Sequence, residues 1–373
     1  MHLDPTDEQR ALAEALGDLL EKRYEPRARL ELLGSERGWS ETLWKQYADM
    51  GLLGLTVDEE HGGAGMGTAE LGTVMEQFGR ALVLEPFFAT VVLGATLVSL
   101  AGTTEQRADL LPAVAAGERQ LAFAWAEPSS RWSLTDVSTV AVDNDGTWSL
   151  TGTKSAVLNG AAADTLLVTA RRPGGALGVF VVDAARVRRS GYVQQDGLRA
   201  ADVVLDATPA VPLGDHVDAL PLVEQVVDTA TAMLCAEAVG AMDRMLWLTV
   251  DYLKNRVQFG TPIAVFQALQ HRAADMYVSL EQARSMALLA RLSLDDDDAV
   301  ERRRAVQAAK LQIDLAAKHV GQEAVQLHGG IGMTMEYPVG HYVKRTAVIA
   351  KTFDDADGLV RAVGAGPGLV PPA

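Results

Sequence analysis

Hydrophobic positions recur at helical spacing through the first third of the chain. Leu12, Leu16, Leu19 and Leu20 lie three or four residues apart, and Leu43, Trp44, Tyr47 and Met50 repeat the pattern. This period predicts amphipathic helices over residues 5–117. The stretch EEHGGAGMG at residues 59–67 interrupts them, and it lacks the glycine spacing and the Gly-Lys-Ser/Thr of a phosphate loop. We therefore expect it to connect two helices.

Short runs of β-branched residues replace the helical pattern between residues 120 and 214. They are TVAVDNDGTWSLTG, TLLVTARR, LGVFVVDA and ADVVLDATPAVPLG. Turn signals such as Asn-Asp-Gly and Pro-Gly-Gly separate the runs, which predicts a small antiparallel sheet or barrel. Strands and helices do not alternate here, and this argues against a Rossmann domain.

Helical spacing returns near residue 220 and continues almost to the end of the chain. It predicts helices over residues 220–256, 266–294, 301–327 and 339–352, followed by a Gly/Pro-rich tail at 364–373. The predicted fold is α+β. An N-terminal α-helical domain occupies residues 1–118, a central β-barrel or sheet domain occupies 119–218, and a C-terminal four-helix bundle occupies 219–373.

Charge and composition narrow the classes of partner. The formal net charge of −16 argues against nucleic acid or an anionic membrane as the main partner. No apolar run reaches the roughly 20 residues of a membrane span, and the polar N-terminus is unlike a signal peptide, so we expect a cytoplasmic protein. One cysteine, Cys235, excludes an internal disulfide and a Cys-based zinc site, and the histidines show no metal spacing. An anionic ligand would need local cations.

The stretch YLKNRVQFGTPIAVFQALQH, residues 252–271, offers such a cation between two predicted helices. Arg256 supplies a permanent charge and several donors for a pyrophosphate, Gln258 can bond phosphate or ribose, and Phe259 offers a flat surface to an adenine. The Gly-Thr-Pro turn lets Phe266 and Gln267 face the same ligand. Taken singly, each position is more typical of a solvated or core residue.

Two longer stretches resemble the acyl-CoA dehydrogenase family. They are YLKNRVQFGTPIAVFQALQHRAADM and AVQLHGGIGMTMEYPVGHYVKR, and the resemblance runs nearly from end to end in the same α, β, α order. The sequence is most similar to the pimeloyl-CoA dehydrogenase small-subunit type, through GRALVLEPFFATVVLG, LAFAWAEPSSR and AEAVGAMD.

The resemblance implies a cofactor, a substrate and partners. The cofactor is FAD, the substrate an acyl-CoA, and the assembly a tetramer that passes electrons to an electron-transfer flavoprotein or a similar acceptor. The segment from Arg256 to Gln267 would reach across a subunit interface to another subunit's FAD. Gln326, Gly329 and Gly330 would line the same cofactor, where glycine lets backbone amides approach it closely.

The catalytic base of the family is missing at its usual positions. The family reaction removes an α-proton with a carboxylate while the β-hydrogen leaves as hydride to the flavin. The resemblance places that carboxylate at Phe353 or, in other members, at Ala230, and neither side chain accepts a proton. Asp354 and Asp355 follow directly and are candidates, although a pair of exposed acids capping or following a helix is the plainer interpretation. Glu237 is a weaker candidate, for which an interhelical hydrogen bond or ion pair is the commoner fate.

The residues expected around the flavin ring are also altered. The family's Thr-Glu-Pro becomes Ala-Glu-Pro with Glu127 retained, and its Trp-Ile-Thr becomes Ala156, Val157 and Leu158. The nucleotide clamp is thus retained while the base is absent, which favours a subunit that completes a catalytic partner's FAD site. The alternatives are a self-sufficient homotetramer using Asp355 or Asp354, and a non-catalytic assembly or regulatory partner that binds no flavin.

Overall fold

The computed structural model of the chain describes residues 4–365, so most of the predicted C-terminal tail lies outside it. Two compact units are present. The first, called here the bundle unit, comprises Met1–Leu30, Thr68–Val83 and Thr231–Ala373 within the described range. The second, called the barrel unit, comprises Glu31–Gly67 and Leu84–Ala230. Helix α7 begins in the barrel unit and continues into the bundle unit.

A closed sheet forms the centre of the barrel unit. Its strands are β1 (Leu121–Ala124), β2 (Val140–Asn144), β3 (Thr147–Leu158), β4 (Thr165–Arg171), β5 (Leu177–Asp183), β6 (Arg188–Val193) and β7 (Arg199–Pro212). The order β4-β2-β3-β7-β5 returns to β4, with β1 beside β4 and β6 beside β7. Most pairs are antiparallel; β1–β4 and β2–β4 are parallel. The prediction of a small barrel is confirmed.

Apolar side chains fill the barrel, and helices complete this unit. Leu150, Leu166 and Phe180 are fully buried in the core, as alternation of side chains along each strand requires. The helices are α3 (Glu41–Asp49), α5 (Thr96–Ala101) and α6 (Thr104–Ala115), with a π-helix at Phe88–Ala95; α2 (Pro26–Gly34) crosses the boundary between the units. The π-helix was not predicted.

A buried ion pair lies among the barrel strands. Lys154 Nζ is 2.8 Å from Glu127 Oε1, and the Lys154 side chain is 0% exposed. Lys154 also donates to Thr169 Oγ1, while Glu127 accepts from the backbone and hydroxyl groups of Ser138 and Thr139. Burial alone would raise the pKa of Glu127, but these donors outweigh burial and lower it to about 2. The pair is therefore ionised and fully hydrogen-bonded.

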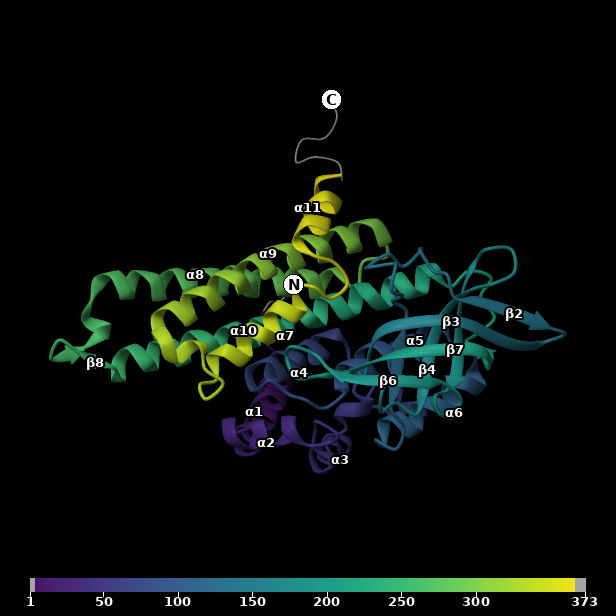
Figure 1. Ribbon diagram of the computed structural model, residues 1–373, viewed down its shortest axis with the longest axis horizontal. Coiled ribbons are helices and arrows are strands. Elements are labelled where there is room, and N and C mark those ends of the chain that lie inside the picture. Colours follow the sequence, from purple (N-terminus) through teal and green to yellow (C-terminus); the bar gives the residue numbers. More distant parts are fainter. Residues whose placement is uncertain (1–3, 366–373) are drawn as a thin grey trace. The chain divides into compact units, whose positions relative to one another are not determined.

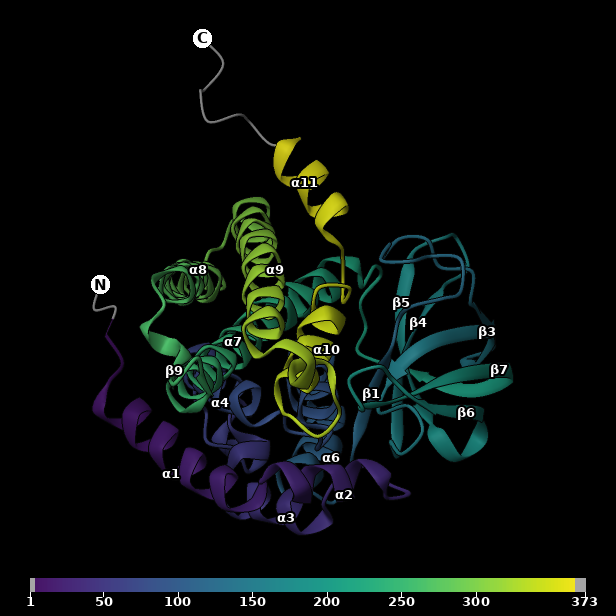
Figure 2. The same cartoon turned by 60° about the vertical axis from the view of Figure 1, so that its left-hand side comes forward.

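Long helices make up the bundle unit (Figures 1 and 2). They are α1 (Asp7–Arg23), α4 (Thr68–Ala81), α7 (Leu220–Asn255), α8 (Gln267–Ser293), α9 (Ala299–His328), α10 (Val339–Ile349) and α11 (Ala356–Gly364). Helix α9 packs against α8, α10 and α11. The predicted helices match α7 to α10 closely, except that the last one ends at Ile349 and a further helix, α11, follows after a short turn.

Helices α4 and α7 cross with their backbones in contact. A Cβ added at Gly79 would overlap the carbonyl oxygen of Glu237, and one added at Gly240 would overlap the carbonyl oxygen of Glu76. Each helix therefore presents a glycine to a carbonyl of the other. Only glycine allows this approach, because any side chain would push the two axes apart.

Ion pairs join the helices around this crossing. Glu237 forms a bidentate pair with Arg345 of α10, with N···O distances of 2.6 and 2.7 Å. The interhelical ion pair expected for Glu237 is thus present. Asp243 lies between Arg80 of α4 and Arg284 of α8, and the Arg284–Asp243 contact is 2.7 Å. These buried carboxylates are committed to holding helices together.

Candidate functional site: an exposed hairpin and a glycine turn

A short β-hairpin links α7 to α8 and carries the first predicted motif (Figure 1). Strands β8 (Val257–Gln258) and β9 (Thr261–Pro262) pair antiparallel, leaving Phe259 and Gly260 as a two-residue turn. Both turn residues have positive φ, 54° and 75°, as a type I′ turn requires. Arg256 closes the hairpin, since its carbonyl accepts from Ile263 N at 2.9 Å.

Phe259 is in an unusual environment for an aromatic residue. Its side chain is 92% exposed, and its backbone has the left-handed conformation that glycine or asparagine normally adopts. The ring of Phe266 contacts it edge-on, at 6.1 Å between centroids. A strained backbone that presents a large apolar ring to water is typical of a binding position rather than of a solvated turn.

The polar members of the motif also reach solvent. Arg256, Gln258 and Gln267 are all exposed. Among residues 4–365 the Arg256 guanidinium makes no hydrogen bond and no ion pair, whereas Gln258 Nε2 donates only to the neighbouring Val257 carbonyl. The hairpin therefore offers a cation, amides and an aromatic face to an external ligand.

The second motif ends α9 with an open glycine turn. Gln326, Gly329 and Gly330 are exposed, and Gly329 ends the helix with a φ of 65°. A Cβ at either glycine would meet nothing within 4 Å. The left-handed φ explains glycine at Gly329, whereas at Gly330 packing within residues 4–365 does not require it. The open backbone at Gly330 agrees with a surface that a ligand approaches closely.

Ring contacts connect the two motifs, and sequence reasoning missed them. His328, which directly precedes Gly329, contacts Tyr252 of α7 at 4.5 Å and Tyr337 at 4.7 Å between ring centroids. Tyr252, His328 and Tyr337 all lie within the two quoted stretches, but no periodic pattern in the sequence predicts that their rings are in contact.

The two positions at which the resemblance implies a catalytic carboxylate are Phe353, just before α11, and Ala230 in α7. Ala230 is fully buried in α7, and Phe353 has a left-handed φ of 67° just before α11. Asp355 is the N-cap of α11: its Oδ1 accepts from Gly358 N at 3.0 Å, and its Oδ2 lies 3.1 Å from Lys351 Nζ. Asp354 accepts from Asp355 N at 2.8 Å. Asp355 thus has a local role in starting a helix, and Asp354 bonds the backbone immediately before it.

The altered flavin-ring segment belongs to the barrel unit. Leu158 is half-buried in β3, opposite Ala200 of β7. Ala156 has a left-handed φ of 52°, and its amide donates to Asp202 Oδ1 at 3.2 Å. An amide at this position that could bond a ligand is therefore already engaged, and no side-chain hydroxyl replaces it at residues 156–158.

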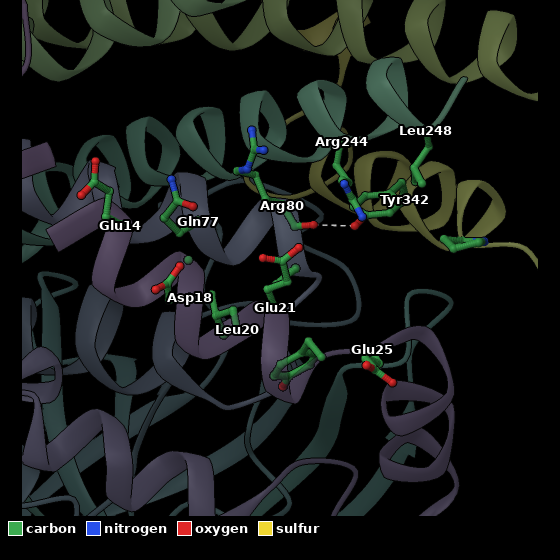
Figure 3. Close-up of a pocket in the computed structure, with 14 residues that line it drawn as sticks. Glu14, Asp18, Leu20, Glu21, Glu25, Gln77, Arg80, Arg244, Leu248 and Tyr342 are labelled. Atoms are coloured by element: carbon green, nitrogen blue, oxygen red, sulfur yellow. Dashed lines mark hydrogen bonds between the residues drawn. The ribbon is translucent and has the colours of Figure 1, made fainter. Parts of the chain in front are cut away.

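A cleft in the bundle unit has a volume of about 530 Å³ and is lined by residues of α1, α4, α7 and α10 (Figure 3). Carboxylates of Glu14, Asp18, Glu21 and Glu25 follow one wall. Arg80 and Arg244 line the opposite wall, but Arg80 is already paired with Asp243. The remaining charge is strongly negative, so this cleft would repel CoA or a dinucleotide.

Within 4–365 there is no cluster of three or more histidine, cysteine or acidic side chains that could hold a metal ion. Across the same range, none of the helices combines the length and apolar character needed to traverse a bilayer.

Comparison with known proteins places each part of the chain in one family. Residues 6–118, 122–206 and 221–351 match the N-terminal, middle and C-terminal domains of acyl-CoA dehydrogenases. The acyl-CoA dehydrogenase IpdE2 of Mycobacterium tuberculosis is 31% identical over 96% of this chain and 97% of its own. The IpdE2 of Mycolicibacterium smegmatis is 31% identical over 91% of this chain and 92% of its own.

Solved structures agree with the sequence comparison. The Tcur3481-Tcur3483 steroid ACAD superimposes with a TM-score of 0.87 and 32% identity, over 96% of this chain and 97% of that one. The ChsE4-ChsE5 complex of Mycobacterium tuberculosis gives a TM-score of 0.90 and 25% identity over the full length of both chains. The chain therefore belongs to the acyl-CoA dehydrogenase family, whose members are oxidoreductases acting on CH–CH bonds.

Proposed function

We propose that the chain is a subunit of a FAD-dependent acyl-CoA dehydrogenase. It would bind the nucleotide half of a FAD whose flavin ring lies in a related partner subunit, and that partner would also supply the catalytic base. The observation that carries this proposal is Phe259, a left-handed and almost fully exposed aromatic beside the unpaired Arg256. Water is a poor environment for such a ring, and an adenine would cover it.

The residues present fit the nucleotide half of FAD. Arg256 would hold the pyrophosphate, Phe259 and Phe266 would pack against the adenine, and Gln258, Gln267 and Gln326 would bond phosphate or ribose. Gly329 and Gly330 would bring backbone amides to the same group. When bound, FAD supplies the hydride acceptor; this chain's residues bind and orient its nucleotide end. Leu158, from the barrel unit, would contribute only apolar contact to a flavin.

Exposed apolar residues on the bundle support a partner. Tyr277 and Val278 of α8 and Leu315 of α9 are each about half exposed, at 49%, 53% and 50%. Exposed large apolar side chains are typical of subunit contacts. Among the similar structures, the ChsE4-ChsE5 complex and the Tcur3481-Tcur3483 dehydrogenase are both named as pairs. By analogy, the partner here would be a related dehydrogenase subunit. The proposed substrate is an acyl-CoA. The proposed electron acceptor is an electron-transfer flavoprotein or a similar protein.

Replacing Arg256 tests the clamp. Arg256→Ala is expected to lower the FAD content of the purified assembly and its FAD affinity by tenfold or more, since a charge-assisted hydrogen bond contributes about 1.5–3 kcal/mol. Arg256→Lys should recover part of the loss, because lysine keeps the charge without the planar fork. The measurement is visible flavin absorbance per assembly, followed by titration with FAD after the flavin is stripped.

Lys254→Ala is the matched control, because Lys254 is an exposed cation in the last turn of the same helix. It should leave FAD binding unchanged. Full FAD content in Arg256→Ala would contradict the proposal. It would favour the alternative that the chain is a non-catalytic assembly or regulatory partner that binds no flavin.

Substituting the two aspartates decides between a partner's base and a base in this chain. Asparagine caps a helix as well as aspartate but cannot accept the α-proton. We therefore expect Asp355→Asn and Asp354→Asn to change the kcat/KM of the assembly by less than about twofold. A loss of about a hundredfold or more from either variant would instead identify that residue as the base of a self-sufficient enzyme. Melting temperatures report whether the cap is retained.

A further inference from the structure

The rings of Tyr252, His328 and Tyr337 form one cluster inside the bundle unit. His328 contacts both tyrosines at 4.5 and 4.7 Å, and the tyrosines meet each other edge-on at 6.1 Å between centroids. His328 is 3% exposed, whereas the two tyrosines are half-buried. Every ring thus touches both others, and the cluster behaves as a single packed block.

Each ring is attached to a different part of the surface that presents the two motifs. The carbonyl of Tyr252 accepts from Arg256 N at 2.8 Å, so this residue holds the last turn of α7 directly beneath the hairpin. His328 is the last residue of α9 and adjoins Gly329 and Gly330. Tyr337 follows the Gly329–Met333 turn, just before α10. The cluster therefore fixes three backbone segments relative to one another.

His328 is itself held in one orientation. Its Nδ1 lies 2.7 Å from the Ala324 carbonyl, to which Nδ1–H donates, and a Cβ on Gly332 would touch the His328 side chain at 3.0 Å. Burial lowers the pKa of His328, so a neutral ring packs between the tyrosines. The loop after α9 closes over this ring and has little freedom to shift.

We propose that Tyr252, His328 and Tyr337 are positioning residues that set the spacing between the Arg256 hairpin and the Gly329–Gly330 turn, so that one nucleotide engages both. The inference rests on the proposed function. None of the three rings needs to touch the ligand. Removing a ring would let the two motifs move independently, and a group held about 1 Å out of place can lower the affinity for the ligand by up to about a hundredfold.

The test uses ADP, which carries only the nucleotide half of FAD. The assembly is purified from the cells that naturally produce the chain, stripped of flavin and titrated with ADP and with FAD. His328→Leu and Tyr337→Leu are expected to weaken both ligands by the same factor, about tenfold to a hundredfold. Tyr252→Phe and Tyr337→Phe keep the rings and should bind as the unmodified chain does.

His319→Leu is the matched control, because His319 lies on the same helix and its Nδ1 is 2.9 Å from Ser279 Oγ, outside both motifs. It should leave ADP affinity unchanged. The inference fails if the leucine variants assemble with unchanged ADP affinity, or if they weaken FAD while leaving ADP binding intact. If Arg256→Ala also leaves ADP and FAD affinity unchanged, the clamp itself is wrong; if only the ring variants are silent, the clamp stands and the positioning role does not. If His328→Leu fails to fold, the ADP and FAD affinities of Tyr337→Leu, a variant at a half-buried site, decide the test.

Discussion

Gly79→Ala is expected to destabilise the bundle unit by about 3 kcal/mol or more, which is the upper range for overpacking. The added methyl would overlap the Glu237 carbonyl oxygen, a backbone atom that cannot rotate away. Relief requires α4 and α7 to separate, and that separation would strain the Glu237–Arg345 pair on the next helix. Gly240→Ala should have a similar effect, since it meets the Glu76 carbonyl in the same way. Denaturant unfolding followed by circular dichroism measures both.

Gly72→Ala on the same helix separates this effect from helix propensity. Its added methyl would lie 3.3 Å from a methylene of the Arg291 side chain, which is flexible enough to give way. We expect a change within about 1 kcal/mol, and alanine's better helix propensity would favour a gain. Equal losses in Gly72→Ala and Gly79→Ala would contradict the backbone contact between α4 and α7.

Lys154→Met is expected to cost the barrel unit about 3–5 kcal/mol, because it leaves the Glu127 carboxylate buried without its cation. The double variant Lys154→Met, Glu127→Gln should be less destabilised than the sum of the single variants, since it removes the uncompensated charge. Chemical unfolding followed by tryptophan fluorescence measures the difference. Arg119→Met, which breaks an exposed pair with Asp109, is the control and should change stability by less than about 0.5 kcal/mol.

Acid should reveal the same pair. The folded-state pKa of Glu127, about 2, lies below its usual 4.5, so the folded state favours the ionised carboxylate. Its contribution to stability is therefore complete above about pH 4.5 and declines as pH falls toward 2. Glu127→Gln should remove this part of the acid dependence. If the stability of the variant falls with pH in the same way as that of the unmodified chain, the Lys154–Glu127 pair is not the cause of this pH dependence.

Local patterns predicted the order of the elements well. Helical spacing located α7 to α9 and alternating runs located the strands, because both periodicities arise from burying one face of an element. The Gly-Thr-Pro signal placed a turn near residue 260, and helical spacing placed the end of α9 at Leu327, one residue before its last residue, His328. The two parts of the proposed clamp could thus be located from sequence, although their roles remain predictions.

Contacts between distant residues could not be predicted. Phenylalanine is not a turn residue, so nothing local indicated that Phe259 adopts a left-handed conformation. The ring cluster depends on where α7 and α9 meet, and the crossing at Gly79 depends on a carbonyl far along the chain. Helix α11 was missed because it is short and its start is defined by the Asp355 cap rather than by a long apolar period.

The bundle unit is assembled from separate stretches of the chain, and this has a consequence during protein synthesis. Helices α1 and α4 leave the ribosome early, whereas the rest of their unit begins at Thr231, roughly 150 residues after Val83. At about 5–20 residues per second, α4 waits on the order of 10–30 s before α7 emerges to cover Gly79. During that interval α1 can already pack against α4, but the side of α4 that meets α7 at Gly79 has no native counterpart, while the barrel unit has time to fold. A nascent-chain chaperone that shields α4 until α7 is translated would therefore raise the yield of folded protein.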